Sequence, residues 1–168
     1  MTPRYEIREL TYADLPGVIA LERRAFPTPW SLAMFTLELA KPSNVSLAAH
    51  GEDGELLGYV ICSRYADVWH LMNVAVDPPR RRGGVASNLL ESLFDRIGSA
   101  QRYTLEVRRS NLEAVALYRR YGFSYAGVRP RYYRDNGEDA VIMWRLPASE
   151  AKHHSTARKR GSKVHERA

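Results

Sequence analysis

The feature that most constrains the fold is segment 69–97, in which a strand-like run, a basic loop and a helix-like run follow one another. Residues 69–76, WHLMNVAV, are rich in residues that favour strands, and the prolines after Asp77 end the run. From residue 84 onward, apolar side chains recur at helical spacing. Their shared face consists of Val85, Leu89, Leu90, Leu93, Phe94 and Ile97. The segment therefore predicts a strand, a loop and a helix that packs on a sheet.

The loop between this strand and this helix has the composition of an anion site. Arg80, Arg81 and Arg82 supply positive charge, and Gly83 and Gly84 stand where the helix begins. The first N–H groups of a helix have no partner within the helix and lie at the positive end of its dipole, so they bind phosphate readily. No Gly-Lys-Ser/Thr and no GxGxxG is present, which excludes a P-loop and a Rossmann fingerprint. A basic surface loop that only caps a helix is the alternative interpretation.

The rest of the sequence alternates between strand-like and helix-like periodicities. The order is strand, two helices, three strands, helix, strand, helix and two strands. Because this is not a strict strand–helix–strand repetition, it predicts an α/β (α+β) fold with a mixed central sheet. The predicted strands span residues 4–10, 45–50, 56–63, 69–76, 103–109, 123–133 and 140–146, and the predicted helices span 14–25, 32–40, 84–97 and 111–122.

The 168 residues predict one folded domain, residues 1–147, followed by a basic tail, residues 148–168. The tail has six Lys or Arg residues against two Glu residues, so it carries +4 of the net charge of +6. It has no apolar periodicity, and we expect it to be disordered. Weak, salt-dependent contact with RNA and simple solubilisation are both compatible with such a tail. The remaining +2 gives a nucleic-acid function of the domain little support.

Cysteine usage and hydropathy bear on the compartment. The single cysteine, Cys62, cannot form an internal disulfide or a multi-cysteine metal site, which is typical of a reducing, cytoplasmic setting. No signal peptide and no apolar run of roughly 18 residues is present, so we expect no membrane association. The pair His153-His154 lacks further ligands at metal-site spacing, so we expect no metal. We expect the protein to be a monomer.

Several motifs, taken in order and spacing, resemble one acetyltransferase family. Residues 81–86, RRGGVA, match Arg/Gln-x-x-Gly-x-Gly/Ala, the acyl-CoA pyrophosphate motif of the GNAT acetyltransferases, although Gly83 replaces an often basic residue. The strand NVAVDP precedes the motif directly. The other matching segments are FPTPWS (26–31), LEVRRSN (105–111), ALYRRYGF (116–123) and RPRYYRDNGEDAVIM (129–143). Together they are similar to the RimI family of ribosomal-protein-alanine N-acetyltransferases.

The resemblance covers about residues 5–146 and carries expectations of fold and activity. It implies the GNAT fold, with a mixed sheet of about seven strands flanked by four helices. It implies transfer of acetyl from acetyl-CoA to the N-terminal amine of a protein, directly in a ternary complex. The family's named substrate is the N-terminal alanine of small-subunit ribosomal protein number eighteen.

Two residues correspond to the family's catalytic pair. A neutral amine must attack the thioester, and a base that takes its proton assists this step. The glutamate of LEVR is the family's base, which implies that role for Glu106; a half-exposed strand glutamate is the alternative. The tyrosine of ALY is the family's proton donor to the leaving thiolate, which implies that role for Tyr118. A core tyrosine at helical spacing is the alternative.

The resemblance also implies two sets of binding residues. By the resemblance, backbone groups of residues 74–76 face the pantetheine arm and could stabilise an oxyanion. Residues 81–87 bind the pyrophosphate. Asn111 contacts coenzyme A and also caps a helix. Trp30, Tyr132 and Tyr133 grip the peptide, although ordinary sheet packing explains two tyrosines equally. Glu138 and Asp139 either attract a basic peptide or form a solvated turn. The coenzyme set is Val74, Ala75, Val76, Arg81, Arg82, Gly83, Gly84, Val85, Ala86, Ser87 and Asn111.

Two other functions remain open at this point. One is a GNAT enzyme that acetylates protein lysines or a small amine, which the Tyr132-Tyr133 pair disfavours through the resemblance alone. The other is a ribosome- or RNA-binding module without activity, which intact Glu106 and Tyr118 disfavour.

Overall fold

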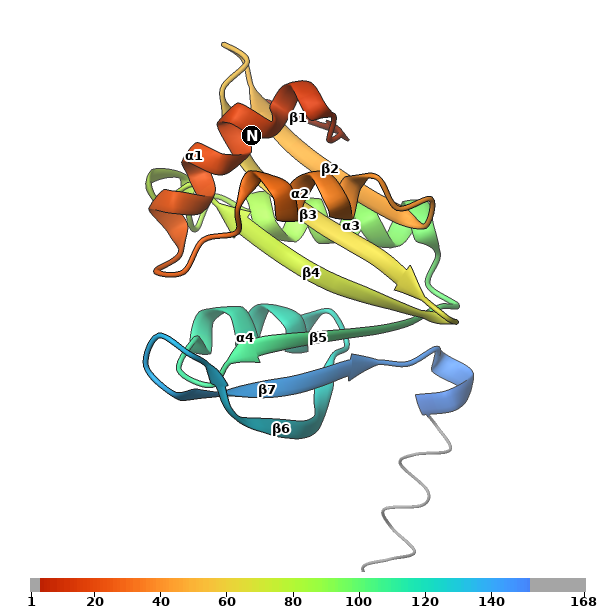
Figure 1. The fold of residues 1–168 in the computed structure, drawn as a ribbon. Helices are drawn as coiled ribbons and strands as arrows, with labels where there is room; N and C mark the ends of the chain where they lie inside the picture. The colour runs from red at the N-terminus through yellow and green to blue at the C-terminus, as the bar shows by residue number, and fades with distance from the viewer. Residues whose placement is uncertain (1–3, 152–168) are drawn as a thin grey trace, which may run out of the picture.

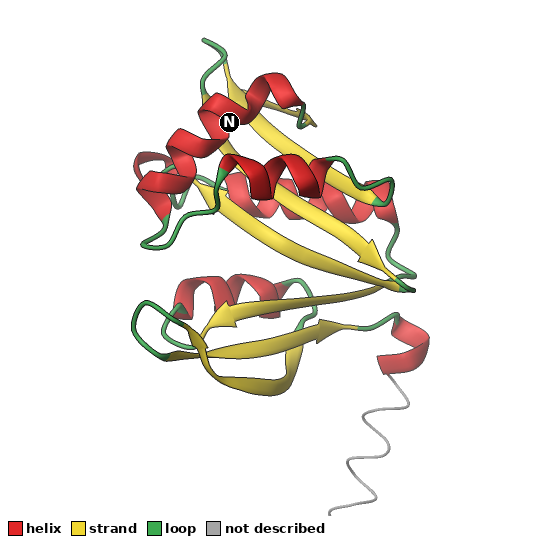
Figure 2. Cartoon of the chain, viewed as in Figure 1, coloured by secondary structure: helices red, strands yellow, loops and turns green. Residues whose placement is uncertain are grey.

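The central feature is a seven-stranded mixed sheet in the order β1-β2-β3-β4-β5-β7-β6, visible in Figures 1 and 2. The structure, a computed structural model, describes residues 4–151. All neighbouring strands pair antiparallel except β4 and β5, which are parallel. The strands are β1 (Tyr5–Glu9), β2 (Asn44–Gly51), β3 (Leu56–Tyr65), β4 (Val68–Val76), β5 (Arg102–Arg108), β6 (Ser124–Tyr133) and β7 (Glu138–Arg145).

Four helices cover the sheet, two on each face, as Figure 1 shows. They are α1 (Leu15–Ala25), α2 (Leu32–Leu39), α3 (Val85–Ile97) and α4 (Leu112–Arg120). Side chains alternate across a strand, so one strand serves two cores. On β3, Tyr59 and Ile61 pack with α1 and α2, whereas Val60 and Cys62 pack with α3.

Local sequence explains where the helices begin. The Ser31 hydroxyl caps α2 by accepting the Met34 N–H at 3.3 Å, and the Asn111 side chain caps α4 by accepting the Ala114 N–H at 3.2 Å. No side chain caps α3, which begins after Gly84 in the left-handed conformation. The first N–H groups of α3 are therefore not satisfied by a side-chain cap.

The parallel pair β4–β5 is short. It runs from Val68 opposite Arg102 to Leu71 opposite Leu105 and then stops. At the same point β4 carries a bulge, because Ile61 pairs with Asn73 while Cys62 pairs with Leu71. A bulge adds a residue, here Met72, and increases local twist, so β4 turns away from β5. The two strands consequently open toward their C-terminal ends, as Figure 1 shows.

The predicted element order and the mixed seven-stranded sheet with four helices are confirmed. Cys62 is buried as a small apolar residue, and burial raises the pKa of its thiol. The expected disorder of residues 148–168 needs one correction. Residues 148–151 form a helical turn, because the Glu150 carboxylate pairs with Arg102 at 3.0 Å and the Pro147 carbonyl accepts the N–H of Ala151. The rest of the tail lies outside the described residues.

Two glycine substitutions test the packing on β3 and α1. A Cβ at Gly58 would lie 2.8 Å from the Ala75 carbonyl oxygen on β4, whereas one at Gly17 would meet only Leu56 at 3.6 Å. We expect Gly58→Ala to lower the free energy of unfolding by about 1–3 kcal/mol through overpacking. Gly17→Ala should raise it by about 0.4–1 kcal/mol. Urea denaturation measures both, and equal effects would contradict the close approach of β3 and β4.

Candidate active site

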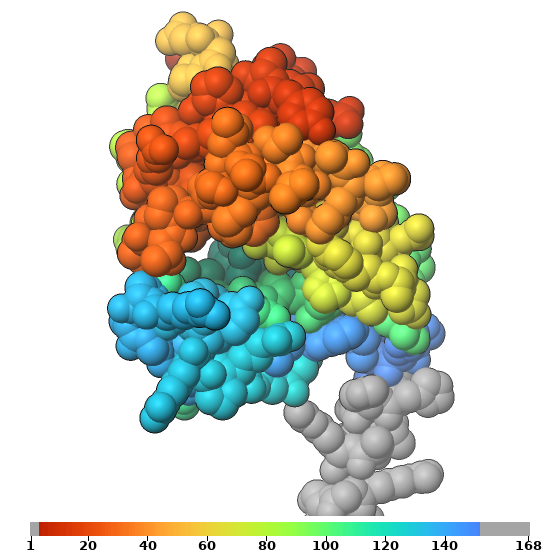
Figure 3. Space-filling view, in the orientation of Figure 1, coloured from red at the N-terminus to blue at the C-terminus, as the bar shows by residue number. Residues whose placement is uncertain are grey.

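A cavity of about 1100 Å³ lies where β4 and β5 open. Figure 3 shows a hollow between α1–α2 and the β6–β7 end of the molecule. The cavity exceeds the roughly 300–1,000 Å³ of ordinary small-molecule pockets, so it can hold a large ligand. Of the residues proposed from the sequence, Gly83 and Tyr132 do not line it. Those that do are Trp30, Val74, Ala75, Val76, Arg81, Arg82, Gly84, Val85, Ala86, Ser87, Glu106, Asn111, Tyr118 and Tyr133.

The start of α3 forms one wall of the cavity and is suited to an anion. Gly84 has a φ of +82°, which favours glycine, and an added Cβ would meet nothing within 4 Å, so a ligand can approach the backbone. Arg82 also has a positive φ, +66°. The Arg81 Nε donates to the Val76 carbonyl at 3.4 Å and so lies against β4. Uncapped N–H groups, the helix dipole and these guanidinium groups together favour phosphate.

The second wall is the edge of β4 beyond Leu71. No described strand pairs with this edge, because β5 has already diverged. Residues 74–76 line the cavity here, and their backbone can pair with an extended amide-containing chain, as one strand pairs with another. Val74 and Val76 pack on the α3 core and Ala75 on the α1 core, so their side chains fix the strand.

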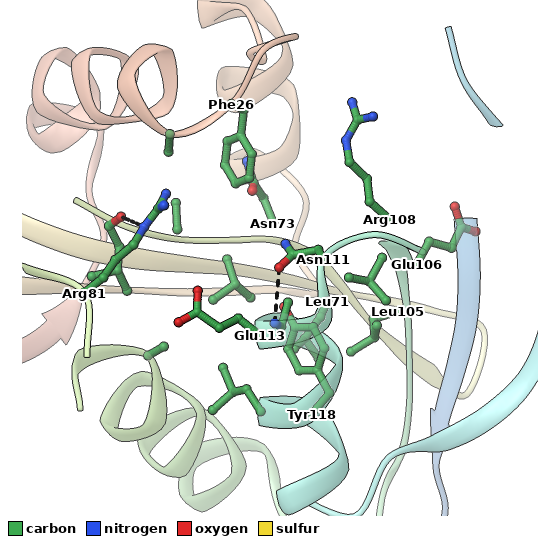
Figure 4. Close-up of a pocket in the computed structure, with 18 of the residues that line it drawn as sticks. Phe26, Leu71, Asn73, Arg81, Leu105, Glu106, Arg108, Asn111, Glu113 and Tyr118 are labelled. Atoms are coloured by element: carbon green, nitrogen blue, oxygen red, sulfur yellow. Dashed lines mark hydrogen bonds between the residues drawn. The ribbon is translucent and has the colours of Figure 1, made fainter. Parts of the chain in front are cut away.

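Tyr118 lies on α4, between the cavity and the α3 core. Its side chain is 8% exposed and packs edge-on against Phe123, with ring centroids 5.8 Å apart. Burial raises the pKa of its hydroxyl, so the group stays protonated at neutral pH. Figure 4 shows the ring directed into the cavity from α4. Tyr118 is thus both a core residue and a proton-bearing group at the site.

Glu106 lies on the opposite face of β5 from Tyr118. Leu105 and Val107 belong to the α3 core that contains Tyr118, so the side chain between them points to the α1–α2 face. It is 28% exposed, and Oε1 forms an ion pair with Nε of Arg129 on β6 at 2.9 Å. Burial and then the nearby Glu106 raise the pKa of Tyr132, which places that ring beside the carboxylate. This partly exposed position gives the carboxylate access to solvent and is compatible with both interpretations of Glu106, so its role as a base stays a prediction.

The β6–β7 loop, residues 134–137, is fastened to β5. The Arg108 guanidinium donates to both Asp135 oxygens at 3.0 Å and covers the Tyr133 ring at 4.0 Å. Glu138, at the start of β7, accepts the Ser110 N–H at 2.9 Å. Hydrogen bonding from the side chain and then the backbone of Ser110 lowers the pKa of the Glu138 carboxyl. Burial raises the pKa of Tyr133 to about 12.

The expectation that Glu138 and Asp139 form a solvated turn needs correction, because both begin β7, whereas attraction of a basic peptide stays a prediction. Asp139 accepts the Arg131 N–H at 2.9 Å and lies 3.5 Å from Arg109. With Glu138 engaged by Ser110 and Arg108, both carboxylates have partners inside the protein. They fix the loop, because replacing these partners with a peptide would leave an arginine and backbone N–H groups unpaired.

Trp30 lies in the α1–α2 loop and lines the cavity, but its ring also packs on Phe35 with centroids 5.2 Å apart. The backbone N–H of Trp30 donates to the side-chain carboxylate of Glu22 on α1. Four further residues, to which the sequence motifs gave no role, also line the cavity: Glu22, Asn73, Phe26 and Arg108, the last three labelled in Figure 4. Glu22 occurs in a helical run beside Leu21, and a charged residue on a core-facing position was the one available signal.

The arrangement suits group transfer between two ligands that enter from opposite faces. An anionic, extended ligand fits the α3 and β4 walls, with Tyr118 at its inner end. A second ligand can reach Glu106 from the face that carries the α1–α2 and β6–β7 loops. The described residues contain no group of three or more His, Cys, Asp or Glu side chains placed to hold a metal ion. Within residues 4–151, no helix is long and apolar enough to cross a membrane.

Comparison with known proteins identifies the family. Residues 15–123 match the model of the acetyltransferase (GNAT) family. The [ribosomal protein bS18]-alanine N-acetyltransferase of Escherichia coli is 38% identical over 148 residues, which cover 85% of this chain and 97% of that protein. The N-alpha-acetyltransferase RimI of Mycobacterium tuberculosis is 39% identical over 145 residues, 83% and 90% of the two chains. The chain belongs to the GNAT acetyltransferase family, in its RimI branch.

Solved structures of GNAT proteins agree with this assignment. The crystal structure of the E. coli ribosomal-protein-S18-alanine N-acetyltransferase superimposes with a TM-score of 0.78 at 35% identity, covering 85% of this chain and 93% of that one. A structure of Arabidopsis thaliana NAA60 in complex with acetyl-CoA shares the fold, with a TM-score of 0.73 at 19% identity over 84% of this chain and 99% of that one. The protein is thus an acetyltransferase, as expected from its motifs.

The fastening of the β6–β7 loop in this GNAT protein gives a stability prediction. Arg108→Met leaves Asp135 and Glu138 without their partly buried cation, so we expect the free energy of unfolding to fall by about 1.5–3 kcal/mol. Arg109→Met is the matched control, because the Arg109 side chain is 70% exposed and its pair with Asp139 contributes about 0–1 kcal/mol. Urea denaturation gives both values. Equal losses, or no loss with Arg108→Met, would contradict the fastening role.

Proposed function

We propose that the protein transfers acetyl from acetyl-CoA to the α-amine of a protein N-terminus, namely the N-terminal alanine of ribosomal protein bS18. The observation that carries this proposal is the opening between β4 and β5, which joins an anion-binding wall to a carboxylate on the other face. The name of the E. coli relative, aligned over nearly its whole length, supports the choice of substrate.

The residues present fit acetyl-CoA. The start of α3, with residues 81–87, would hold the pyrophosphate, and Arg80 and Arg120 also line the cavity. The free edge of β4 at residues 74–76 would pair with the amides of the pantetheine arm. Asn111 lies at the start of α4 beside the same path. Bound there, acetyl-CoA supplies the activated acetyl group as a thioester.

Glu106 would act as the general base and Tyr118 as the general acid. Glu106 takes a proton from the amine, directly or through one water, as the amine nitrogen bonds to the acetyl carbon. The bond between that carbon and sulfur breaks, and Tyr118 donates its hydroxyl proton to the sulfur. A backbone N–H on the free edge of β4 stabilises the negative charge on the acetyl oxygen. No covalent acetyl-enzyme is needed, so both substrates are bound together.

The acceptor would reach Glu106 between the α1–α2 loop, which contains Trp30, and the tyrosine pair Tyr132 and Tyr133. The Arg129 guanidinium pairs with Glu106 in the free protein, and the neutral amine of the arriving substrate can replace it by donating an N–H to the carboxylate. Both a protein N-terminus and a lysine side chain could make this exchange. The relatives' names favour the N-terminus.

A peptide panel tests the acceptor class. We expect mass spectrometry to show acetylation of a short peptide that begins Ala-Arg, with less on peptides that begin Met, Ser or Gly. A peptide with a blocked N-terminus and an internal lysine should stay unmodified. Transfer to the blocked peptide alone would contradict the proposal and indicate a lysine acetyltransferase.

Substitution of the proposed base tests the mechanism. Glu106→Gln keeps the side-chain volume and removes the carboxylate, so we expect kcat/KM for the Ala-Arg peptide to fall about 10²- to 10⁴-fold. The affinity for acetyl-CoA, measured by calorimetry, should change little, because Glu106 lies on the other face of β5. Full activity in this variant would refute the role of Glu106.

Tyr118 gives a prediction of pH dependence. Since burial raises the pKa of Tyr118, its protonated, proton-donating form persists to higher pH than that of an exposed tyrosine. We expect kcat/KM to rise as the substrate amine loses its proton, with a pKa of about 7.7–8.0, and then to stay level to about pH 10. Tyr118→Phe should lower kcat about 100-fold. Tyr125→Phe, on exposed β6, is the matched control with unchanged rates. A decline in activity between pH 8 and 9 that Tyr118→Phe abolishes would contradict this account.

A further inference from the structure

Glu22 on α1 is a buried carboxylate for which the mechanism above has no use. Its side chain is 1% exposed, and no Lys, Arg or His within residues 4–151 forms an ion pair with it. A buried charge without a cation persists only where hydrogen bonds satisfy it. Burial of this carboxylate beside the cavity costs free energy, so its position needs an explanation.

Three elements donate hydrogen bonds to this carboxylate. The Asn73 side chain, on β4 next to the bulge, donates to both oxygens at 2.9 and 3.1 Å. The Tyr59 hydroxyl on β3 donates to Oε2, and the Trp30 N–H donates to Oε1 at 3.1 Å. The Tyr59 pKa is raised by burial and then by Glu22, so its hydroxyl remains a donor. With four hydrogen bonds the acceptor capacity of the carboxylate is filled, so Glu22 has no lone pair left for a substrate proton.

Glu22 holds both ends of one loop, residues 26–30. The Phe26 N–H donates to the Glu22 backbone carbonyl at 3.0 Å, and the Trp30 N–H donates to the Glu22 side chain. Between them the sequence reads Pro-Thr-Pro, and proline has no N–H to offer. Thr28 is the only residue between the two ends that has an N–H, and its N–H has no acceptor among the described residues. The far end of the loop therefore depends on the Glu22 carboxylate.

We infer that Glu22 is a positioning residue for acyl transfer: it sets the height of loop 26–30 above β4, and with it the wall against which the acceptor peptide lies. The inference rests on the proposed function, in which this loop faces the acceptor. Asn73 connects the same carboxylate to the strand beside the acetyl position. One buried group thus aligns the acceptor wall with the free edge of β4. Sub-ångström alignment of this kind affects rates strongly, because a misplacement of about 1 Å can cost about 100-fold.

The test compares three variants by steady-state kinetics with the Ala-Arg peptide. Glu22→Met keeps the volume but accepts no hydrogen bond, so kcat/KM for the peptide should fall about 10- to 100-fold while KM for acetyl-CoA stays within about twofold. Glu22→Gln should restore kcat/KM to within about threefold of wild type, because its carbonyl accepts the Trp30 N–H and its amide can donate to the oxygens of Tyr59 and Asn73.

Tyr103→Phe is the matched stability control. It removes another buried hydroxyl, which donates to the Gly98 carbonyl at 2.7 Å on the α3 side, away from loop 26–30. It should lower Tm without changing kcat/KM for the peptide. If both Tyr103→Phe and Glu22→Met lost peptide activity in proportion to the decrease in their Tm, Glu22 would act through stability alone. That result would overturn the inference.

A measurement without variants decides the anchoring even if a variant fails to fold. In the wild-type protein, NMR hydrogen exchange should show the Trp30 amide strongly protected and the Thr28 amide exchanging freely. Equal, fast exchange of both amides would overturn the inference. This readout needs no activity, so a wild-type protein that protects Trp30 yet acetylates no free N-terminus would refute the proposed function and leave the anchoring intact.

Discussion

The structure depends on one constraint in the sheet, the early end of pairing between β4 and β5. The two strands are parallel neighbours over only four residue pairs, ending at Leu71 and Leu105. Unpaired backbone groups inside a protein are costly, so an edge of this kind needs a partner. A bulge at Met72 turns β4 away at the same place, and the start of α3 lies beside the freed edge. The opening thereby creates both a backbone edge that can bind a ligand and a passage between the two faces.

The two faces have different chemistry because strand alternation separates their side chains. Tyr118, buried and protonated, belongs to the core on the α3 and α4 side, together with the cationic start of α3. Glu106 belongs to the other face and pairs there with Arg129. A thiolate leaving on one side and an amine arriving on the other match this separation. The α1–α2 and β6–β7 loops, which border the proposed acceptor side, are hydrogen-bonded to Glu22 and Arg108, and we propose that these contacts form the acceptor wall before the substrate binds.

Local patterns in the sequence were sufficient to predict the strands and helices and the glycine turn that precedes α3. Periodicity placed all seven strands and four helices, and Gly84 lies at the positive φ that its place before a helix requires. The spatial relation of Glu106 to Tyr118 could not be read locally, since it depends on which strands pair and where β4 and β5 separate. The partners of Glu138 and Asp139 were likewise invisible, because Arg108, Ser110 and Arg109 precede them by about thirty residues. The motif match named residues, and tertiary pairing decided what each one contacts.

The central claim is that both substrates meet across the β4–β5 opening, each on its own face. A conjugate that joins coenzyme A through an acetyl linker to the α-amine of an Ala-Arg peptide tests this most directly, by calorimetric titration against coenzyme A and the acetylated peptide alone. We predict that the conjugate binds at least about 100-fold more tightly than either part, because the second binding event becomes intramolecular. A conjugate that binds no more tightly than coenzyme A would contradict the account, since the two sites could then not be occupied together through the opening.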